Sequence, residues 1–376
     1  MTQSLLLISY FSPCRGHAGG LRLLDLYGEI RRILPQIRLE LLTCEHPGVD
    51  WGYGDLDSIF DRIHRVLPEQ FGTGLLDTLP GTSGSFDLVD LQYHQSGAQI
   101  GACRRRWPEA TIIFSPMESM IRSVLKRTGQ GNIISRQYLK AAWPALQEAW
   151  YLRKSDRVVF VSRPDMDAVQ FMRGKKPFYC IPTCVSDQEF PKKEYLQASL
   201  ERRVVVFVAY FGSRTNQEAL EWYCGFVHPR LRSEFPDYVL RVVGRGLDTS
   251  LVRSCTGDGI EFLGPVDDIA DVLRESDMGI APAIMGAGVR GKIHQYAVVG
   301  LPCVASALAS EGLDYVSGES ILIAEKDTDF IEHCRTLLSD GNVRRKMGSL
   351  AKEVCARHYS WHVMKTSIST VYELDP

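Results

Sequence analysis

Short apolar segments alternate with longer amphipathic segments along the whole chain. In the first half, the apolar runs predict strands at residues 5–10, 38–43, 87–92, 111–115 and 157–162. In the second half, they predict strands at residues 204–210, 238–244, 260–264, 278–282, 303–306 and 321–324. Several of these runs are apolar almost without interruption, as is typical of parallel strands covered by helices on both faces. We therefore predict an α/β fold with two doubly wound, Rossmann-like domains.

A polar stretch separates the two halves of this pattern. It lies near residues 180–200 and contains Pro191 and a pair of lysines, after which a new apolar strand begins abruptly. We expect one domain over residues 1–195 and another over 196–359, with a C-terminal helix at 360–376 that packs back on the first domain. An open parallel sheet binds its ligand beyond the carboxyl ends of its strands. Two such sheets facing each other would form a cleft, so the loops after the strands should carry the chemistry.

The composition narrows the class of protein. The 376 residues include 43 basic and 45 acidic side chains, a balance that does not favour nucleic-acid binding. The ten cysteines form no CxxC pair, so neither a zinc site nor a disulfide framework is indicated. The N-terminus does not resemble a secretion signal, and no apolar run is long enough to span a bilayer. We expect a cytoplasmic protein, with a peripheral membrane contact at the inner face left open by the basic run at residues 104–106.

The most informative loop follows the predicted strand at residues 278–282. It contains the small residues Gly286, Ala287 and Gly288, and a helix is expected to begin near Val289. Small residues allow a ligand to approach the backbone, and free N–H groups at a helix start favour an anion. The first turn also carries Arg290 and Lys292, although cations oppose the helix dipole there. A bound diphosphate would compensate both charges. The alternative is a tight strand–helix connection with basic residues on the surface.

Polar residues also follow strands of the first half. His17, Gly19 and Gly20 come after the first strand, while His94 and Glu118 come after two later ones. His94 and Glu118 could reach sugar or acceptor hydroxyls. The alternative is that any tight strand–helix turn needs glycines and that His17 is an exposed loop residue. Glu148, in a helical segment, is interpreted as solvated or ion-paired.

Residues 204–313 carry a more specific signal. Their order of strand, GAGVRGK, helix, GLP with an apolar strand, and then EGL resembles the donor-binding half of glycosyltransferase family 4, retaining enzymes of GT-B fold. In the first half, SDRVVFVS, IPTCVSDQEF and CRGHAGGLR are similar to other segments of that family. The likeness therefore extends over nearly the whole chain. It implies a nucleotide-diphosphate sugar as substrate, with no cofactor and no metal.

The resemblance also implies roles for particular residues. Gly264 and Pro265 would border the base, while Arg214, Arg290 and Lys292 would neutralise the diphosphate. Backbone amides of Gly286, Ala287, Gly288 and Val289 would assist, and Gln295, Glu311, Gly19 and Gly20 would contact the donor. Arg214, Lys292, Glu118 and His17 are the candidate catalytic residues. The N-terminal domain would bind the acceptor.

The family pattern is broken at two places. Two glutamates that the family commonly carries are replaced here by Ala287 and Gln295, and the usual NGvD segment reads Thr183-Cys184-Val185-Ser186. Gln295 could still hydrogen-bond ribose hydroxyls but supplies no charge. These departures indicate a divergent branch with unusual donor contacts, or a member that has lost activity.

We therefore predict a retaining glycosyltransferase that acts on a glycan, lipid-linked or small-molecule acceptor. Polysaccharide, glycolipid or natural-product assembly would be its setting. One alternative is a non-catalytic GT-B scaffold that binds a partner enzyme or a glycan, motivated by the missing glutamates. The other is a nucleotide-sugar epimerase, for which the chain offers no clear acid–base pair.

Overall fold

The chain folds into two compact α/β units. The computed structural model describes residues 3–46, 56–79, 84–129, 136–186, 202–285 and 291–374. Unit 1 comprises residues 1–182 together with 364–376, and unit 2 comprises residues 183–363. The division falls between Pro182 and Thr183, ahead of the boundary expected after residue 195, and the last residues of the chain belong to unit 1.

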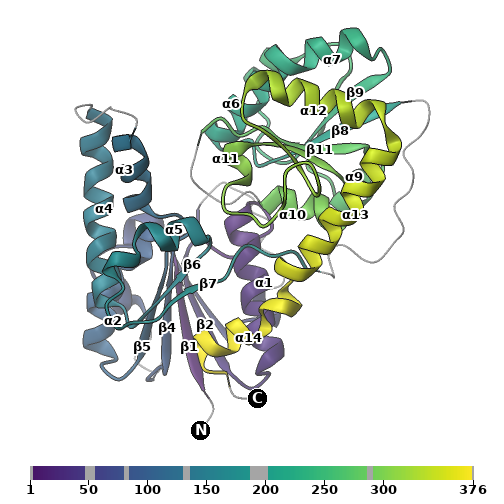
Figure 1. The fold of residues 1–376 in the computed structure, drawn as a ribbon. Coiled ribbons are helices and arrows are strands. Elements are labelled where there is room, and N and C mark those ends of the chain that lie inside the picture. Colours follow the sequence, from purple (N-terminus) through teal and green to yellow (C-terminus); the bar gives the residue numbers. More distant parts are fainter. Residues whose placement is uncertain are drawn as a thin grey trace. The chain divides into compact units, whose positions relative to one another are not determined.

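Unit 1 contains a seven-stranded sheet in which every paired strand is parallel (Figure 1). The strand order is β3-β2-β1-β4-β5-β6-β7. Its elements are β1 (Ser4–Ser9), α1 (Ala18–Ile33), β2 (Arg38–Cys44), β3 (Arg62–Val66), β4 (Leu88–Gln92), α2 (Ile100–Arg106), β5 (Thr111–Ser115), α3 (Met120–Gly129), α4 (Arg136–Lys154), β6 (Arg157–Phe160), α5 (Arg163–Ala168), β7 (Phe178–Cys180) and α14 (Trp361–Tyr372).

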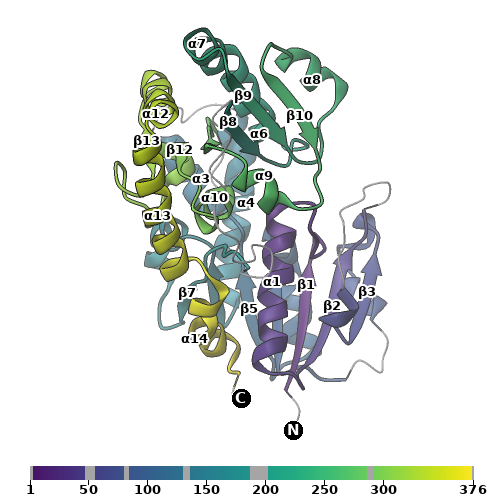
Figure 2. The same cartoon turned by 90° about the vertical axis from the view of Figure 1, so that its right-hand side faces the viewer.

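Unit 2 contains a second parallel sheet, of six strands in the order β10-β9-β8-β11-β12-β13 (Figure 2). Its elements are β8 (Arg203–Val208), α6 (Arg214–Trp222), α7 (His228–Glu234), β9 (Tyr238–Val243), α8 (Thr249–Cys255), β10 (Ile260–Gly264), α9 (Ile269–Arg274), β11 (Met278–Ala281), α10 (Gly291–Val298), β12 (Cys303–Ser306), α11 (Ala307–Ser310), β13 (Leu322–Ala324), α12 (Asp327–Ser339) and α13 (Gly341–His358).

Helices cover both faces of each sheet, and the alternation of side chains along a strand shows how. In β4, Val89 and Leu91 join a buried cluster with residues of α2 and α4. The side chain between them, Asp90, points to the opposite face and accepts hydrogen bonds from Tyr27 of α1 at 2.7 Å and Tyr372 of α14 at 2.6 Å. The C-terminal helix is thus fastened to unit 1 by a buried carboxylate.

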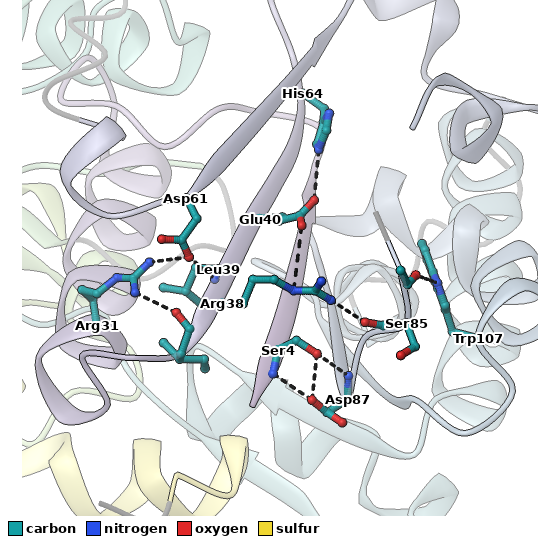
Figure 3. A network of polar contacts seen from close by, with 12 residues as sticks. Ser4, Arg31, Arg38, Leu39, Glu40, Asp61, His64, Ser85, Asp87 and Trp107 are labelled. Carbon is teal, nitrogen blue, oxygen red and sulfur yellow. Dashed lines mark hydrogen bonds and ion pairs between the residues drawn. The ribbon is translucent and has the colours of Figure 1, made fainter. Parts of the chain in front are cut away.

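At the amino ends of the strands, an aspartate side chain recurs as a hydrogen-bond acceptor for the neighbouring strand. In each case it directly precedes one strand and its carboxylate accepts, at 2.8 Å, a backbone N–H from the neighbouring strand. Figure 3 shows two of these contacts in unit 1, where they form part of a wider polar network. The four aspartates and their donors are Asp87 with Ser4, Asp61 with Leu39, Asp156 with Ile112, and Asp277 with Val204. The aspartates of SDRVVFVS and SDMGIAP are therefore structural.

The predicted strands agree with the structure apart from their end residues. Two observed strands, β3 and β7, were not among the predicted ones. All eleven predicted strands are present. β3 was missed because it is a half-exposed edge strand, reading RIHRV, rather than an apolar run. β7 (Phe178–Cys180) lies just before the polar stretch that was expected to separate the two domains. Within the described part of the chain, no helix is both long enough and apolar enough to cross a membrane.

Candidate functional site

The strand order of each sheet reverses at one point, and there the loops from adjacent strands diverge. In unit 1 the reversal lies between β1 and β4, and in unit 2 between β8 and β11. Ligands of open α/β sheets bind at the carboxyl ends of such strands. Residues 10–17 follow β1 and residues 282–285 follow β11, so each of these described segments lies at a reversal point of its own unit.

Lys292 is the central charged residue of the reversal point in unit 2. It lies in the first turn of α10, and its Nζ is 4.5 Å from the ring centroid of Phe207, near the carboxyl end of β8. The same ammonium donates a hydrogen bond of 3.3 Å to the Oδ1 of Asn216, in the first turn of α6. One cation therefore lies at the amino ends of two helices. Over their described residues, neither helix has an acidic side chain in its first turn.

The sequence analysis missed Asn216. Besides accepting from Lys292, its Nδ2 donates to the carbonyl of Tyr210 at 2.8 Å, and the neighbouring Gln217 donates to the carbonyl of Phe211 at 2.7 Å. These bonds fix the loop after β8 against α6. Gly244, after β9, closes the same edge: a Cβ there would lie 1.8 Å from the Ala209 carbonyl oxygen. In the sequence, the adjacent polar residues Asn216 and Gln217, shortly after the predicted strand at residues 204–210, were the available signal.

Other candidate residues of unit 2 lie in more exposed positions. The side chain of Arg214 is 86% exposed, and its Nε is 2.6 Å from an Oε of Glu218, one turn along α6. A surface pair of this kind contributes little to stability, so it leaves the guanidinium accessible to a ligand. Gln295 is half-buried in α10, Glu311 is half-buried after α11, and Gly264 and Pro265 end β10 with φ of 66° at the glycine.

The predicted diphosphate loop cannot be assessed directly. Gly286, Ala287, Gly288, Val289 and Arg290 all lie outside the described residues. The described part of α10 begins at Gly291, so Lys292 and Gln295 are the residues of this segment whose positions the structure gives.

In unit 1, His17 caps the amino end of α1. Its Nδ1 accepts a hydrogen bond from the backbone N–H of Gly20 at 3.1 Å, so the ring proton lies on Nε2. Burial, with a smaller contribution from nearby His46, lowers the pKa of His17 to about 4. The imidazole is therefore neutral at pH 7. Through Nε2 it can donate a hydrogen bond, but its Nδ1 is already occupied as a cap.

The two glycines after His17 are required by close contacts. A Cβ on Gly19 would lie 2.5 Å from the hydroxyl oxygen of Tyr93, and a Cβ on Gly20 would lie 2.5 Å from the sulfur of Cys14. The structure thus brings His17, Gly19 and Gly20 together in one turn at the carboxyl end of β1, beside the residue that follows β4.

The acidic candidates of unit 1 require one correction. Glu118 is half-buried at the loop before α3 and remains a candidate. Glu148 is not solvated as expected, and no ion pair joins it to the described residues: it is fully buried in α4, where one Oε accepts from the Ile121 backbone N–H of α3 at 2.8 Å. Burial raises the pKa of this carboxyl to about 7. His94 is half-buried, and burial lowers its pKa. Among the described residues, no group of three or more His, Cys, Asp or Glu side chains is arranged to hold a metal.

Comparison with known proteins finds relatives over part of the chain. Residues 202–340 match the model of the family described as glycosyl transferases group 1. This match covers less than half of the chain. It agrees with the expected resemblance to glycosyltransferase family 4, and the two parallel sheets agree with the expected GT-B fold. A curated relative, phosphatidyl-myo-inositol mannosyltransferase from Mycolicibacterium smegmatis, is 31% identical over 152 residues, which is 39% of each chain. The match thus spans about two fifths of that relative.

Solved structures of the same fold match over nearly the full length. Sucrose-phosphate synthase from Thermosynechococcus elongatus superposes with a TM-score of 0.74 at 15% identity, covering 99% of this chain and 98% of that one. The Anabaena protein HepE, in complex with UDP and glucose, gives a TM-score of 0.72 at 14% identity, covering 98% and 99%. At these identities the likeness establishes the fold alone.

Proposed function

We propose that this protein transfers a sugar, with retention, from a nucleoside-diphosphate sugar to an acceptor hydroxyl. The observation that carries the proposal is the ammonium of Lys292 at the amino ends of α6 and α10. Both helix dipoles present partial positive charge there, and each favours an anion bound beside the cation by roughly 0.3–1 kcal/mol. A diphosphate supplies two negative groups and can accept hydrogen bonds from the N–H groups of both helices.

This arrangement suits the reaction because of where charge develops. Transfer breaks the bond between the sugar's anomeric carbon and the diphosphate oxygen, and the acceptor oxygen forms the new bond. The departing nucleoside diphosphate gains negative charge, which a preorganised cation and two helix ends stabilise. Arg214 and Arg290 add to this charge in the proposal. Gln295 contacts the ribose, Gly264 and Pro265 border the base, and Glu311 contacts the donor.

Unit 1 would recognise the acceptor and contact the transferred sugar. His17, neutral at pH 7, donates through Nε2, while Glu118 accepts from a hydroxyl; Gly19 and Gly20 allow the donor to approach the turn. HepE is a GT-B structure with bound UDP and glucose, which supports a nucleotide sugar as the substrate.

A panel of nucleotide sugars tests the proposal. We expect at least one to raise the melting temperature and to yield a transferred or hydrolysed sugar detectable by mass spectrometry. Lys292→Ala should weaken binding of that donor on the order of tenfold or more, since charge-assisted contacts to phosphate are worth about 1.5–3 kcal/mol. The matched control is Lys352→Ala, an exposed lysine of α13. Equal loss in both variants, or none in Lys292→Ala, would contradict the assigned role.

We further propose that unit 1 docks on an anionic lipid surface, where a lipid-linked acceptor would lie. Trp143, Leu146 and Trp150 of α4 are 65%, 64% and 43% exposed, and their spacing of three and four residues places them on one side of the helix. Two cations, Arg153 and Lys154, end the same helix. Exposed tryptophans beside basic residues suit a membrane interface with anionic headgroups. The name of the mannosyltransferase relative includes a phosphatidylinositol, in agreement with a lipid acceptor.

Vesicle sedimentation distinguishes this surface from a protein interface. The protein should sediment with phosphatidylglycerol-containing vesicles but not with pure phosphatidylcholine, and Trp143→Ala with Trp150→Ala should abolish the difference. Phe171→Ala, which removes a 78% exposed aromatic outside α4, is the control. Vesicle binding that persists in the double variant would refute the proposal. So would a protein that does not sediment but whose concentration-dependent dimer is lost in the double variant.

A further inference from the structure

Tyr93 combines a strained backbone with a buried hydroxyl that finds no hydrogen-bond partner in the described parts of the chain. Its φ of 70° and ψ of 155° lie in a region that residues other than glycine rarely adopt, and Glu373 is the other such residue in the described chain. The backbone is fixed on both sides, because its N–H donates to Ser115 at 3.1 Å and its carbonyl accepts from Ser96 at 3.2 Å. Strain of this kind persists only where surrounding structure enforces it, and it gathers at functional sites.

The side chain points into the reversal point of unit 1. Tyr93 is 9% exposed, and its ring meets that of Phe11, after β1, edge-on at a centroid distance of 5.1 Å. The hydroxyl oxygen is buried without a hydrogen-bond partner among the described residues. An unsatisfied buried hydroxyl is unfavourable, and a phenylalanine would fill the same volume without it. The oxygen itself therefore requires an explanation.

The nearest feature is the first turn of α1. The tyrosine oxygen would lie 2.5 Å from a Cβ on Gly19, whereas the ring carbons Cε1 and Cζ would lie 3.3 Å away. The hydroxyl thus packs directly behind the backbone of the turn that His17 caps. Only a glycine fits at position 19 while the hydroxyl is present, and the oxygen causes most of that restriction.

We propose that Tyr93 is a positioning residue that braces the first turn of α1 from behind, so that its N–H groups stay directed at an oxygen of the donor substrate. The inference rests on the proposed function, because the turn needs a fixed direction only if it binds a ligand. α1 has sixteen residues, so its amino end carries a full helix dipole. A strained tyrosine and a tight glycine together limit the movement of this turn.

Three variants test the brace: Tyr93→Phe, Gly19→Ala and the double variant. Gly19→Ala should lower the melting temperature, and Tyr93→Phe should restore most of that loss because it removes the atom 2.5 Å away. Tyr93→Phe alone should melt at or above the wild-type temperature. It should nevertheless speed amide hydrogen exchange over residues 12–24 and weaken UDP-glucose binding by about tenfold, since small displacements of a positioned group reduce catalysis and binding strongly.

Hydrogen exchange tests whether Tyr93 braces the turn, and UDP-glucose affinity tests whether the brace matters for donor binding. Unchanged exchange over residues 12–24 in Tyr93→Phe, or no rescue of Gly19→Ala, would show that the hydroxyl braces nothing. Faster exchange with unchanged UDP-glucose affinity and turnover would show a brace without a role in donor binding, which also overturns the proposal. If the wild-type protein binds no member of the nucleotide-sugar panel, the proposed function fails. The donor-binding role of Tyr93 fails with it, and the melting and exchange data then report the packing alone.

Discussion

Replacing Glu148 by glutamine should stabilise the protein, and more so as the pH rises. The carboxyl is fully buried between α4 and α3, and burial raises its pKa from 4.5 to about 7. Below pH 4.5 the carboxyl is protonated in both the folded and the unfolded protein, and its burial then costs no ionisation energy. As the pH rises from 4.5 through 7, the unfolded protein can ionise this group more easily than the folded one, so the free energy of unfolding falls. Each pH unit corresponds to about 1.4 kcal/mol, so ionised Glu148 lowers the unfolding free energy by roughly 3 kcal/mol above pH 7.

Glutamine imitates the protonated carboxyl and can still accept from the Ile121 N–H through its carbonyl oxygen. Urea unfolding followed by circular dichroism should therefore show nearly equal stability of wild type and Glu148→Gln at pH 4, and a gap approaching about 3 kcal/mol at pH 8. Glu109→Gln, which alters an exposed carboxyl of the same unit, should show no such gap. A stability difference that does not depend on pH, or a variant less stable than wild type at pH 8, would contradict the raised pKa of the buried Glu148 carboxyl.

Two further changes test the fastening of the C-terminal helix and the altered donor contacts. Asp90→Asn should destabilise unit 1 by about 1–3 kcal/mol, because one amide oxygen cannot accept all four hydrogen bonds that the carboxyl receives from Tyr27, Tyr372, Gln92 and Ser115, and limited proteolysis should then release α14 first. Gln295→Glu should change donor affinity, measured by calorimetry, by less than about fivefold, since ribose hydroxyls can donate to either side chain; complete loss of binding would mean that the Gln295 amide makes a specific contact.

The sequence predicted the sheets well because their strands are buried on both faces. An uninterrupted run such as VVVFV leaves little alternative to a central parallel strand, and β8 is indeed at the centre of its sheet. β3 escaped detection for the opposite reason, since an edge strand needs few apolar residues. Glu148 was misinterpreted because its burial depends on α3, whose first turn lies some 27 residues earlier in the chain and packs against it. Residue type alone did not reveal that contact.

The candidate site shows the same limit. Sequence patterns located the loops after β1 and β11 and identified Lys292, because strand ends and small residues leave a local signature. They did not reveal that Asn216 connects Lys292 to α6, nor that Tyr93 adopts a positive φ, since both depend on elements distant in the chain. The diphosphate role of the loop at residues 286–290 stays a prediction.

Lys292 and His17 differ in charge, and the pH dependence of catalysis should reflect this difference. Lys292 carries a positive charge at pH 7, whereas the imidazole of His17, with a pKa of about 4, is neutral. Under the proposed function, Lys292 therefore contacts the charged leaving group, whereas the neutral His17 donates to an uncharged hydroxyl. If His17 acts only as an Nε2–H donor, turnover should show no limb from this residue between pH 6 and 8. His17→Asn, which keeps a good helix cap but loses the ring donor, should lower turnover at every pH without changing the shape of the profile. A wild-type limb in this range that disappears in His17→Asn would instead identify His17 as an acid or base and contradict its assignment as a half-buried, neutral cap.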